Sequence, residues 1–319
     1  MFRAIMVPHD GTEASGHALP WAIAAAGLAS AEGPRAALHL VHVPEPAVPP
    51  AALMGDAVMM AVTLPTDAVA TRHALDALVT RLRATGLAAT AAVDESQSPA
   101  RALRAYAKTH GIDLIVMSTH ARGGVGRAML GSVADELVRE SGLPVLLTRR
   151  GDLPPAAVAA ADDARPATIR RILVTLDGTP AAEEILPHAA SLREATGAQC
   201  TLLRVVEPML ASGVLAPPAL VDEEAERQDE VAALAYLETM ASRVGRDVAT
   251  RVLSGRSAAG AITEHLRVER ADVIALATHG RRGMARAFQG STEGALLRKT
   301  DVPLLVVRSS AAVRRDERE

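Results

Sequence analysis

Two loops in this chain have residue types that could bind phosphate. The first, residues 118–132, begins Ser-Thr-His-Ala-Arg-Gly-Gly and ends on Gly131-Ser132. The second, residues 277–291, begins Ala-Thr-His-Gly-Arg-Arg-Gly and ends on Gly290-Ser291. Each loop follows an unbroken apolar run and precedes a helical pattern, which indicates a buried strand, a loop and a helix. Backbone N–H groups at a helix start attract anions, and glycines let a phosphate approach closely.

Arginines in the two loops could hold phosphate in a bidentate manner. They are Arg122 and Arg127 in the first loop and Arg281, Arg282 and Arg286 in the second. Arginines are also common on solvated loops that bind nothing, and both interpretations stay open. The chain has no Gly-x-x-x-x-Gly-Lys-Ser/Thr motif, and we find no Ser-His-Asp, Cys-His or acid-pair arrangement. We therefore expect no Walker-type ATPase, no catalytic residues and, if a nucleoside triphosphate binds, at most slow hydrolysis.

An Asp-Gly-Thr sequence follows the first expected strand of each half, at Asp10 and Asp177. In open parallel sheets, ligands bind beyond the carboxyl ends of the strands, where the strand order reverses. If strand one is central and strand four lies beside it, each aspartate meets a phosphate loop at that place. The carboxylate could then accept hydrogen bonds from ribose hydroxyls or an adenine amine. Asp-Gly-Thr and Gly-Ser could also merely cap helices, but both motifs together, in duplicate, favour a nucleotide.

The two loops belong to an internal repeat. His120 and His279, Gly131 and Gly290, and Pro144 and Pro303 are each 159 residues apart. A length of 319 residues and a hydrophobic content of 49% suit two domains, each with its own core. We expect domains at residues 1–150 and 169–310, a proline-containing linker at 151–168 and a charged tail at 311–319.

Strands alternate with helices five times in each half, which predicts two doubly wound α/β domains with parallel five-stranded sheets. The strands expected in the first half are 3–8, 36–43, 87–93, 112–117 and 143–148, and its helices are 13–29, 67–85, 99–110 and 133–139. The strands expected in the second half are 171–176, 200–206, 248–253, 271–276 and 302–306, and its helices are 180–196, 221–244, 258–270 and 292–298.

Composition excludes several other classes of protein. The net charge of −3 and only five aromatic residues argue against a nucleic-acid partner. The longest apolar stretch, near residues 18–29, is too short to span a membrane, and the N-terminus lacks a signal-peptide pattern. The single cysteine, Cys200, lies in an expected strand and reads as a buried, inert thiol. We therefore expect a cytoplasmic protein with no membrane partner.

Three histidines of the first half offer a rival type of site. His9, His42 and His120 all fall near expected strand ends and, with Asp10, could gather around a transition metal. The second half has Leu176 and Arg204 at the first two of these positions. Packed and hydrogen-bonded histidines are the more common outcome, and we predict no metal site.

The motifs of both halves resemble those of the universal stress protein family. Its ATP-binding type carries Gly-x-x-Gly, nine residues, and Gly-Ser/Thr. In the second half, Gly280 and Gly290-Ser291 match this spacing, and Ala277 replaces the first glycine. In the first half Gly131-Ser132 match, whereas Ser118 and Ala121 replace both preceding glycines. The resemblance covers both halves and implies a fold like that of the adenine nucleotide alpha hydrolases.

The resemblance also implies which residues contact the ligand. Asp10 and Asp177 match an adenosine-contacting aspartate, and Val43 and Val205 match an adenine-contacting valine. Gly255-Arg256-Ser257 resembles the family's turn before its third helix. The first half departs from this pattern and has Gln97-Ser98-Pro99 instead. The second half is therefore the better expected site. The implied cofactors are ATP and Mg²⁺, and the implied binding residues are Asp177, Val205, Leu276, Ala277, His279, Gly280, Arg281, Gly290, Ser291 and Thr292, with Asp10, Val43, Met117, Ser118, Arg122, Gly131, Ser132 and Val133 in the first half.

The function implied by the resemblance is that of an ATP-binding regulatory protein of the stress response, which senses or buffers an adenine nucleotide. One alternative is a nucleotide-free module that binds a partner. Another is a nucleotidyl transferase or ATP pyrophosphatase, although their His-x-Gly-His and Ser-Gly-Gly-x-Asp-Ser signatures are absent. The family dimerises through its last strand, so residues 143–148 and 303–308 are expected to pair within one chain as a pseudo-twofold dimer. Association of two such chains stays open.

Overall fold

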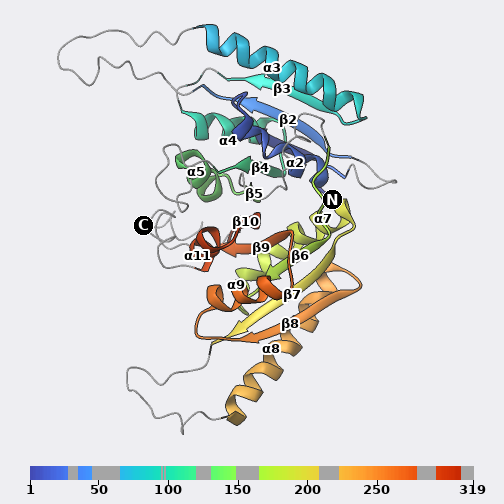
Figure 1. Ribbon diagram of the computed structural model, residues 1–319, viewed down its shortest axis with the longest axis vertical. Coiled ribbons are helices and arrows are strands. Elements are labelled where there is room, and N and C mark those ends of the chain that lie inside the picture. The colour runs from blue at the N-terminus through green and yellow to red at the C-terminus, as the bar shows by residue number, and fades with distance from the viewer. Residues whose placement is uncertain are drawn as a thin grey trace, which may run out of the picture.

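The computed structural model describes residues 1–27, 35–44, 65–94, 96, 98–119, 131–148, 165–207, 223–278 and 292–309. These residues build one sheet of ten strands in the order β3-β2-β1-β4-β5-β10-β9-β6-β7-β8 (Figure 1). The first five strands come from the first half of the chain and the last five from the second. Most of the expected linker (151–164) and the tail at 311–319 lie outside the described residues.

The first half forms the parallel part β3-β2-β1-β4-β5, in which β1 lies between β2 and β4 as expected. The order therefore reverses beside β1. Its strands are β1 Ala4–Pro8, β2 Ala37–His42, β3 Ala89–Val93, β4 Leu114–Ser118 and β5 Val145–Thr148. Its helices are α1 Glu13–Gly16, α2 Leu19–Ala25, α3 Pro65–Ala84, α4 Pro99–Thr109 and α5 Ser132–Glu140.

The second half repeats this arrangement, with β6 between β7 and β9. Its strands are β6 Arg171–Thr175, β7 Gln199–Val206, β8 Val248–Ser254, β9 Val273–Thr278 and β10 Leu304–Arg308. Its helices are the 3₁₀ turn η3 Ala182–Ile185, α7 Leu186–Thr196, α8 Glu223–Val244, α9 Ala258–Val268 and α11 Thr292–Lys299.

Helices cover both faces of the sheet, because its strands are apolar on both sides. On β1, for example, Ile5 and Val7 belong to one buried cluster and Met6 belongs to the other. The first cluster includes residues of α2, α3, α7 and α8, and the second includes residues of α4, α5, α9 and α11. This arrangement confirms the predicted doubly wound α/β class.

The two halves join through their last strands. β5 and β10 pair antiparallel, with Leu147 opposite Leu304 and Val145 opposite Val306. Helix α2 also packs against α7 across this boundary, and the Met1 ammonium lies 3.0 Å from the Glu194 carboxylate. The expected pairing within one chain is therefore present, and it turns two five-stranded sheets into a single ten-stranded one.

Two expected helices are each broken near their start. The pattern at 13–29 predicts one helix, but the structure has α1 and α2 with residues 17 and 18 between them. The pattern at 180–196 also predicts one helix, whereas η3 precedes α7. Pro20 and Pro187 explain both breaks, because a proline has no N–H for the helical ladder and is tolerated only in a first turn. Helix α2 also ends four residues early, before Gly27 with its φ of +82°.

Two further observations concern the expectations from composition. Cys200 is buried, and burial raises the pKa of its thiol to about 12, which suits an inert thiol. None of the helices in the described ranges combines the length and hydropathy needed to cross a membrane.

The last residues of the expected linker pack on the protein, since Ala167 is buried and its N–H donates to the carbonyl of Pro20 at 2.8 Å.

Candidate functional site

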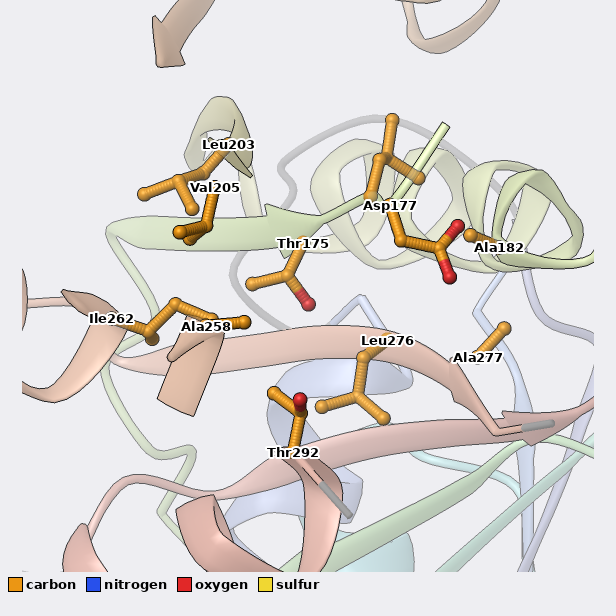
Figure 2. Close-up of a pocket in the computed structure, with 11 residues that line it drawn as sticks. Thr175, Asp177, Ala182, Leu203, Val205, Ala258, Ile262, Leu276, Ala277 and Thr292 are labelled. Carbon is orange, nitrogen blue, oxygen red and sulfur yellow. The ribbon is translucent and has the colours of Figure 1, made fainter. Parts of the chain in front are cut away.

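The second half has a cavity of about 100 Å³ beyond the carboxyl ends of β6, β7 and β9. This is the place where the strand order reverses around β6. In Figure 2, Asp177 lies at one end of the cavity with Ala182 and Ala277, and Ala258 and Ile262 lie at the other. The structure therefore brings together five residues that the sequence assigned to the site, namely Asp177, Val205, Leu276, Ala277 and Thr292.

The Asp177 carboxylate is held by its own turn. Its Oδ1 accepts hydrogen bonds from the N–H of Thr179 at 2.8 Å and from the Thr179 hydroxyl at 2.7 Å. The Thr179 Oγ1 in turn accepts the N–H of Ala182 at 3.2 Å. Gly178 between them has a φ of +88°, a conformation that glycine adopts without strain. The turn therefore caps the start of the following helical turn and also presents an oriented carboxylate to the cavity.

The remaining walls are mainly apolar. Leu203 and Leu276 are buried, Val205 is partly buried, and Ile262 contributes from α9. The polar side chains in the lining, apart from Asp177, are Thr175 and Thr292. An apolar cleft with a few oriented polar groups suits a planar heterocycle attached to a hydroxylated group.

Six residues of this lining were missed from the sequence, namely Thr175, Leu176, Ala182, Leu203, Ala258 and Ile262. They lie at the end of β6, at the start of η3, within β7 and in the first turns of α9. The turn at Gly255-Arg256-Ser257 could have indicated the α9 residues, because Ser257 caps that helix with its Oγ 3.1 Å from the N–H of Gly260. Glu207 adds a second cap, since its carboxylate accepts the N–H of Ala258 at 2.9 Å.

Most of the expected phosphate loops lie outside the described residues. This applies to His279, Gly280, Arg281, Gly290 and Ser291 in the second half, and to Arg122 in the first. The other loop arginines, and Ala121, are outside as well. Thr292 is described, and it lies in the first turn of α11, on the cavity.

Asp10 has the same backbone setting as Asp177. Its Oδ1 accepts the N–H of Thr12 at 3.0 Å and the Thr12 hydroxyl at 2.6 Å, and Gly11 has a φ of +81°. Burial acts to raise the pKa of this carboxyl, but hydrogen bonding with Ser15 and Thr12 outweighs it and lowers the pKa to about 2. Asp10 is therefore a carboxylate at neutral pH.

Two polar side chains beside Asp10, those of His9 and Ser15, stand where the second half has Leu176 and Ala182. His9 is buried, and its Nδ1 accepts the N–H of Gly11 at 3.0 Å and lies 3.2 Å from the Ser15 Oγ. Burial lowers the pKa of His9 to about 4, against an opposing effect of Asp10. Burial also lowers the pKa of the half-buried His42, which lies close enough to interact with His9 and Asp10.

These histidines bear on the rival metal site. His9 uses Nδ1 as a hydrogen-bond acceptor within its own turn, so that nitrogen is engaged. Among the residues that the structure describes, no group of three His, Cys, Asp or Glu side chains is placed to hold a metal ion. His120, the third histidine of the rival site, lies outside them.

The other residues expected in the first-half site lie at the corresponding strand and helix ends. Val43 follows β2, Met117 and Ser118 end β4, and Ser132 and Val133 begin α5. Gly131 is the N-cap of α5, with an extended backbone at φ −62° and ψ 154°. The backbone conformation at this position therefore does not require a glycine.

One correspondence made from the sequence is wrong. Gly255 was compared with Gln97, but α4 begins at Pro99 and α9 begins at Ala258, which are 159 residues apart. Ser98 and Ser257 are therefore equivalent N-cap residues, and the counterpart of Gly255 is Ser96. A Cβ at Gly255 would lie 3.0 Å from the Cβ of Ala261, so tight packing against α9 favours glycine at this position.

Arg204 takes the place of His42 in the second half. Its guanidinium packs directly on the turn after β6, since a Cβ at Gly178 would lie 2.8 Å from the Arg204 Cζ. The same guanidinium lies 5.3 Å from the ring centre of Tyr236 on α8. The Tyr236 hydroxyl donates to the Glu183 carboxylate at 3.4 Å, and Glu183 also pairs with Arg243. These contacts tie α8 to the turn that carries Asp177.

Comparisons with known proteins agree with this geometry. The model of the universal stress protein family matches residues 1–149 and 168–308. A universal stress protein of Mycobacterium tuberculosis is 27% identical over 198 residues, which cover 62% of this chain and 62% of that relative. The chain thus spans less than two thirds of that relative's length. A second one, from Thermus aquaticus, is 34% identical over 154 residues, covering 47% of this chain and 100% of the relative.

Two solved structures share the fold over nearly the whole chain. A universal stress protein from Archaeoglobus fulgidus has a TM-score of 0.64 at 18% identity, and 96% of each chain is covered. A functionally unknown protein from Pseudomonas aeruginosa has a TM-score of 0.62 at 17% identity, covering 99% of this chain and 96% of that one. With both family matches in place, this chain belongs to the universal stress protein family and carries the family's domain twice in tandem.

Proposed function

We propose that this chain is an ATP-binding regulatory protein of the stress response, with its tighter nucleotide site in the second half. The observation that carries the proposal is the cavity at the reversal of the strand order, which gathers Asp177, Val205, Leu276, Ala277 and Thr292. The proposed domains are residues 1–150 and 169–310, with 151–168 as the linker between them and a charged tail at 311–319.

The described walls suit the adenosine part of ATP. Leu203, Val205 and Leu276 offer apolar surface for the base, and the Asp177 carboxylate can accept hydrogen bonds from ribose hydroxyls. The volume of about 100 Å³ is smaller than the ~300–1,000 Å³ of most ligand sites, so these walls suit the base and not a whole nucleotide. The phosphates would extend toward the N-terminus of α11 and the loop of residues 279–291, including Gly290 and Ser291.

Mg²⁺ would accompany the nucleotide and be bound chiefly by its phosphate oxygens. The hydroxyls of Thr292, the first residue of α11, and of the preceding Ser291 in the sequence are protein oxygens that could complete its coordination. Bound Mg²⁺ would neutralise phosphate charge. In the described lining, Asp177 is the one ionisable side chain, and its Oδ1 already accepts two hydrogen bonds from Thr179. With no second group there to activate water, we expect ATP turnover below ~1 per second, measured as phosphate release.

The corresponding strand ends of the first half would bind nucleotide more weakly. Its loop lacks both glycines of the family pattern, at Ser118 and Ala121, and His9 and Ser15 occupy the positions of Leu176 and Ala182. Polar side chains that already bond one another have less to gain from an adenine ring. The first half would then mainly complete the ten-stranded sheet and present a surface to partners.

The test has two parts. Mass spectrometry of the small molecules released from the denatured full-length protein should identify an adenine nucleotide. Titration calorimetry with ATP should then show that Asp177→Ala weakens binding at least about tenfold, because charge-assisted hydrogen bonds are lost. Asp10→Ala is the matched control and should change the tight site little.

A third variant, Gly290→Val, should act like Asp177→Ala, because a β-branched side chain would occupy the phosphate position. The assignment of the working half is wrong if Asp10→Ala abolishes tight binding while Asp177→Ala preserves it. The whole proposal fails if no adenine nucleotide is released and ATP does not bind in the calorimeter.

A further inference from the structure

Helix α8 exposes apolar side chains on a side that does not pack against the sheet. Its buried side consists of Ala233, Leu237, Met240 and Val244, which pack toward the sheet. On another side, Val231 is 69% exposed and Leu234 is 40% exposed. Figure 1 shows α8 beyond β8, at the outer end of the long axis of the molecule. This apolar surface is therefore accessible to another molecule.

The corresponding helix of the first half does not share this surface. Leu75, Val79 and Leu82 are the buried residues of α3 that correspond to Ala233, Leu237 and Met240 of α8, with 158 residues between the members of each pair. The same spacing places His73 and Asp76 at the positions of Val231 and Leu234. Both α3 residues are exposed and polar. The fold itself thus has no need for apolar residues here.

Charged residues extend the apolar pair into a stripe. Arg227 precedes Val231 by four residues, and Glu238 follows Leu234 by four, so all four side chains lie on one side of the helix. At 3.6 residues per turn, this stripe lies about 120° around the helix from the buried side. Arg227 and Glu238 are exposed, and Arg227 also forms an exposed ion pair with Glu224 at 3.3 Å. Exposed pairs of this kind are weak and can exchange partners.

The order of charges along this stripe is complementary to its own reverse. It reads Arg227, Val231, Leu234, Glu238, that is, positive, apolar, apolar, negative. When two such stripes run antiparallel, Arg227 faces the partner's Glu238 and Val231 faces the partner's Leu234. A parallel arrangement would place like charges opposite each other. The surface therefore matches a second copy of itself in one orientation only.

We propose that α8 is the contact through which two copies of this chain associate, as an antiparallel helix pair about a twofold axis near residues 232 and 233. The spacing of four, three and four residues is that of side chains in an antiparallel coiled coil, in which apolar side chains interlock. A twofold contact is closed, so it yields a dimer and no filament. This contact is separate from the β5–β10 pairing, which joins the two halves of one chain.

Sedimentation velocity on the full-length protein, from about 1 µM to about 1 mM, tests the proposal directly. The wild-type chain should show a concentration-dependent monomer–dimer equilibrium. The double variant Val231→Glu with Leu234→Glu should weaken association at least about a hundredfold, because it places charges in the contact. Val268→Glu, on α9, is the matched control, since Val268 is 80% exposed and lies outside the stripe. It should dimerise like the wild type.

Charge reversal tests the orientation. Arg227→Glu alone and Glu238→Arg alone should each weaken the dimer, because each places like charges opposite one another. The double variant Arg227→Glu with Glu238→Arg should restore it, because every pair is opposite in sign again. Circular dichroism spectra that match the wild type would show that all variants fold. A wild-type chain that stays monomeric throughout, or a dimer that none of these changes affects, would overturn the proposal.

Discussion

The turns that follow β1 and β6 have the same backbone and different surroundings. In both, an aspartate accepts two hydrogen bonds from the threonine two residues later, around a glycine with positive φ. In the first half, His9 and Ser15 lie beside this turn and bond each other. In the second half, Leu176 and Ala182 take their places, and both line the cavity.

This difference separates the part of the turn that is the same in both halves from the part that varies between them. Asp-Gly-Thr positions the first helical turn after the central strand, so it persists in both halves. The neighbouring residues decide whether the space beyond the strand is polar or apolar. Among the described residues, the second half alone combines the aspartate with Leu176 and Ala182, and for this reason the proposed function places the tighter nucleotide site there.

The largest predicted difference between the two turns is in their effect on stability in acid, and it comes from His9. Its pKa is about 4 in the folded protein, against 6.5 for an ordinary histidine. As the pH falls from about 6.5 to 4, the unfolded chain binds a proton at this residue and the folded chain does not, so stability is lost in that window. A pKa lowered by this much corresponds to a loss of about 3 kcal/mol in the free energy of unfolding. Replacing His9 with the leucine found in the second half should remove that part of the loss.

Urea denaturation of the wild type and His9→Leu at pH 7 and pH 4 measures this effect. His42, His39 and His188 also have lowered pKa values, so both proteins should lose some stability in acid. The difference between them isolates His9, and His73→Leu serves as an exposed control on α3. Equal losses in the wild type and His9→Leu would show that His9 does not make the two turns differ in their response to pH.

The two glycines of the turns should respond differently to alanine. Gly11 and Gly178 both have positive φ, so either substitution should cost about 1 kcal/mol in strain. At Gly11 the new Cβ would meet Thr71 at an ordinary 3.4 Å, but at Gly178 it would lie 2.8 Å from the Arg204 guanidinium. Gly178→Ala should therefore cost roughly a further 0.5–1 kcal/mol, because Arg204 must leave Tyr236.

A double-mutant cycle with Arg204→Ala, followed by thermal denaturation, checks this explanation. Once Arg204 is absent, Gly178→Ala and Gly11→Ala should destabilise the protein equally. An undiminished difference would mean that something other than Arg204 restricts the second turn.

The smallest predicted effect concerns the threonines. Thr12 and Thr179 each accept a backbone N–H at 3.2 Å and donate to their aspartate. Alanine at either position should cost about 1 kcal/mol in unfolding free energy, as for other helix N-caps. Only Thr179→Ala should also reduce ATP affinity in calorimetry, by severalfold, because it loosens Asp177. Equal effects of both variants on ATP binding would remove the functional distinction between the turns.

Much of the fold and part of the site follow from local patterns. Unbroken apolar runs mark strands that are buried on both faces, and the repeat doubles every such signal. Asp177 and Thr292 could be found because their motifs are short and contiguous. The breaks before α2 and α7 were missed, although Pro20 and Pro187 stand in the sequence. An alanine-rich pattern still reads as one helix, because the pattern alone does not show that residues 17 and 18 leave the helical path.

The sequence by itself determined the two-domain repeat, the order of strands and helices, and the placement of an aspartate after each central strand. It determined these because each strand, helix and motif is a pattern of residues close together in the chain, and the repeat shows every such pattern twice. The tertiary structure alone decided that Leu203, Ala258 and Ile262 share one cavity, that Arg204 packs on Gly178, and that Val231 and Leu234 remain exposed. These contacts join or separate residues that are far apart in sequence, and they depend on strand register and on how each helix is rotated against the sheet.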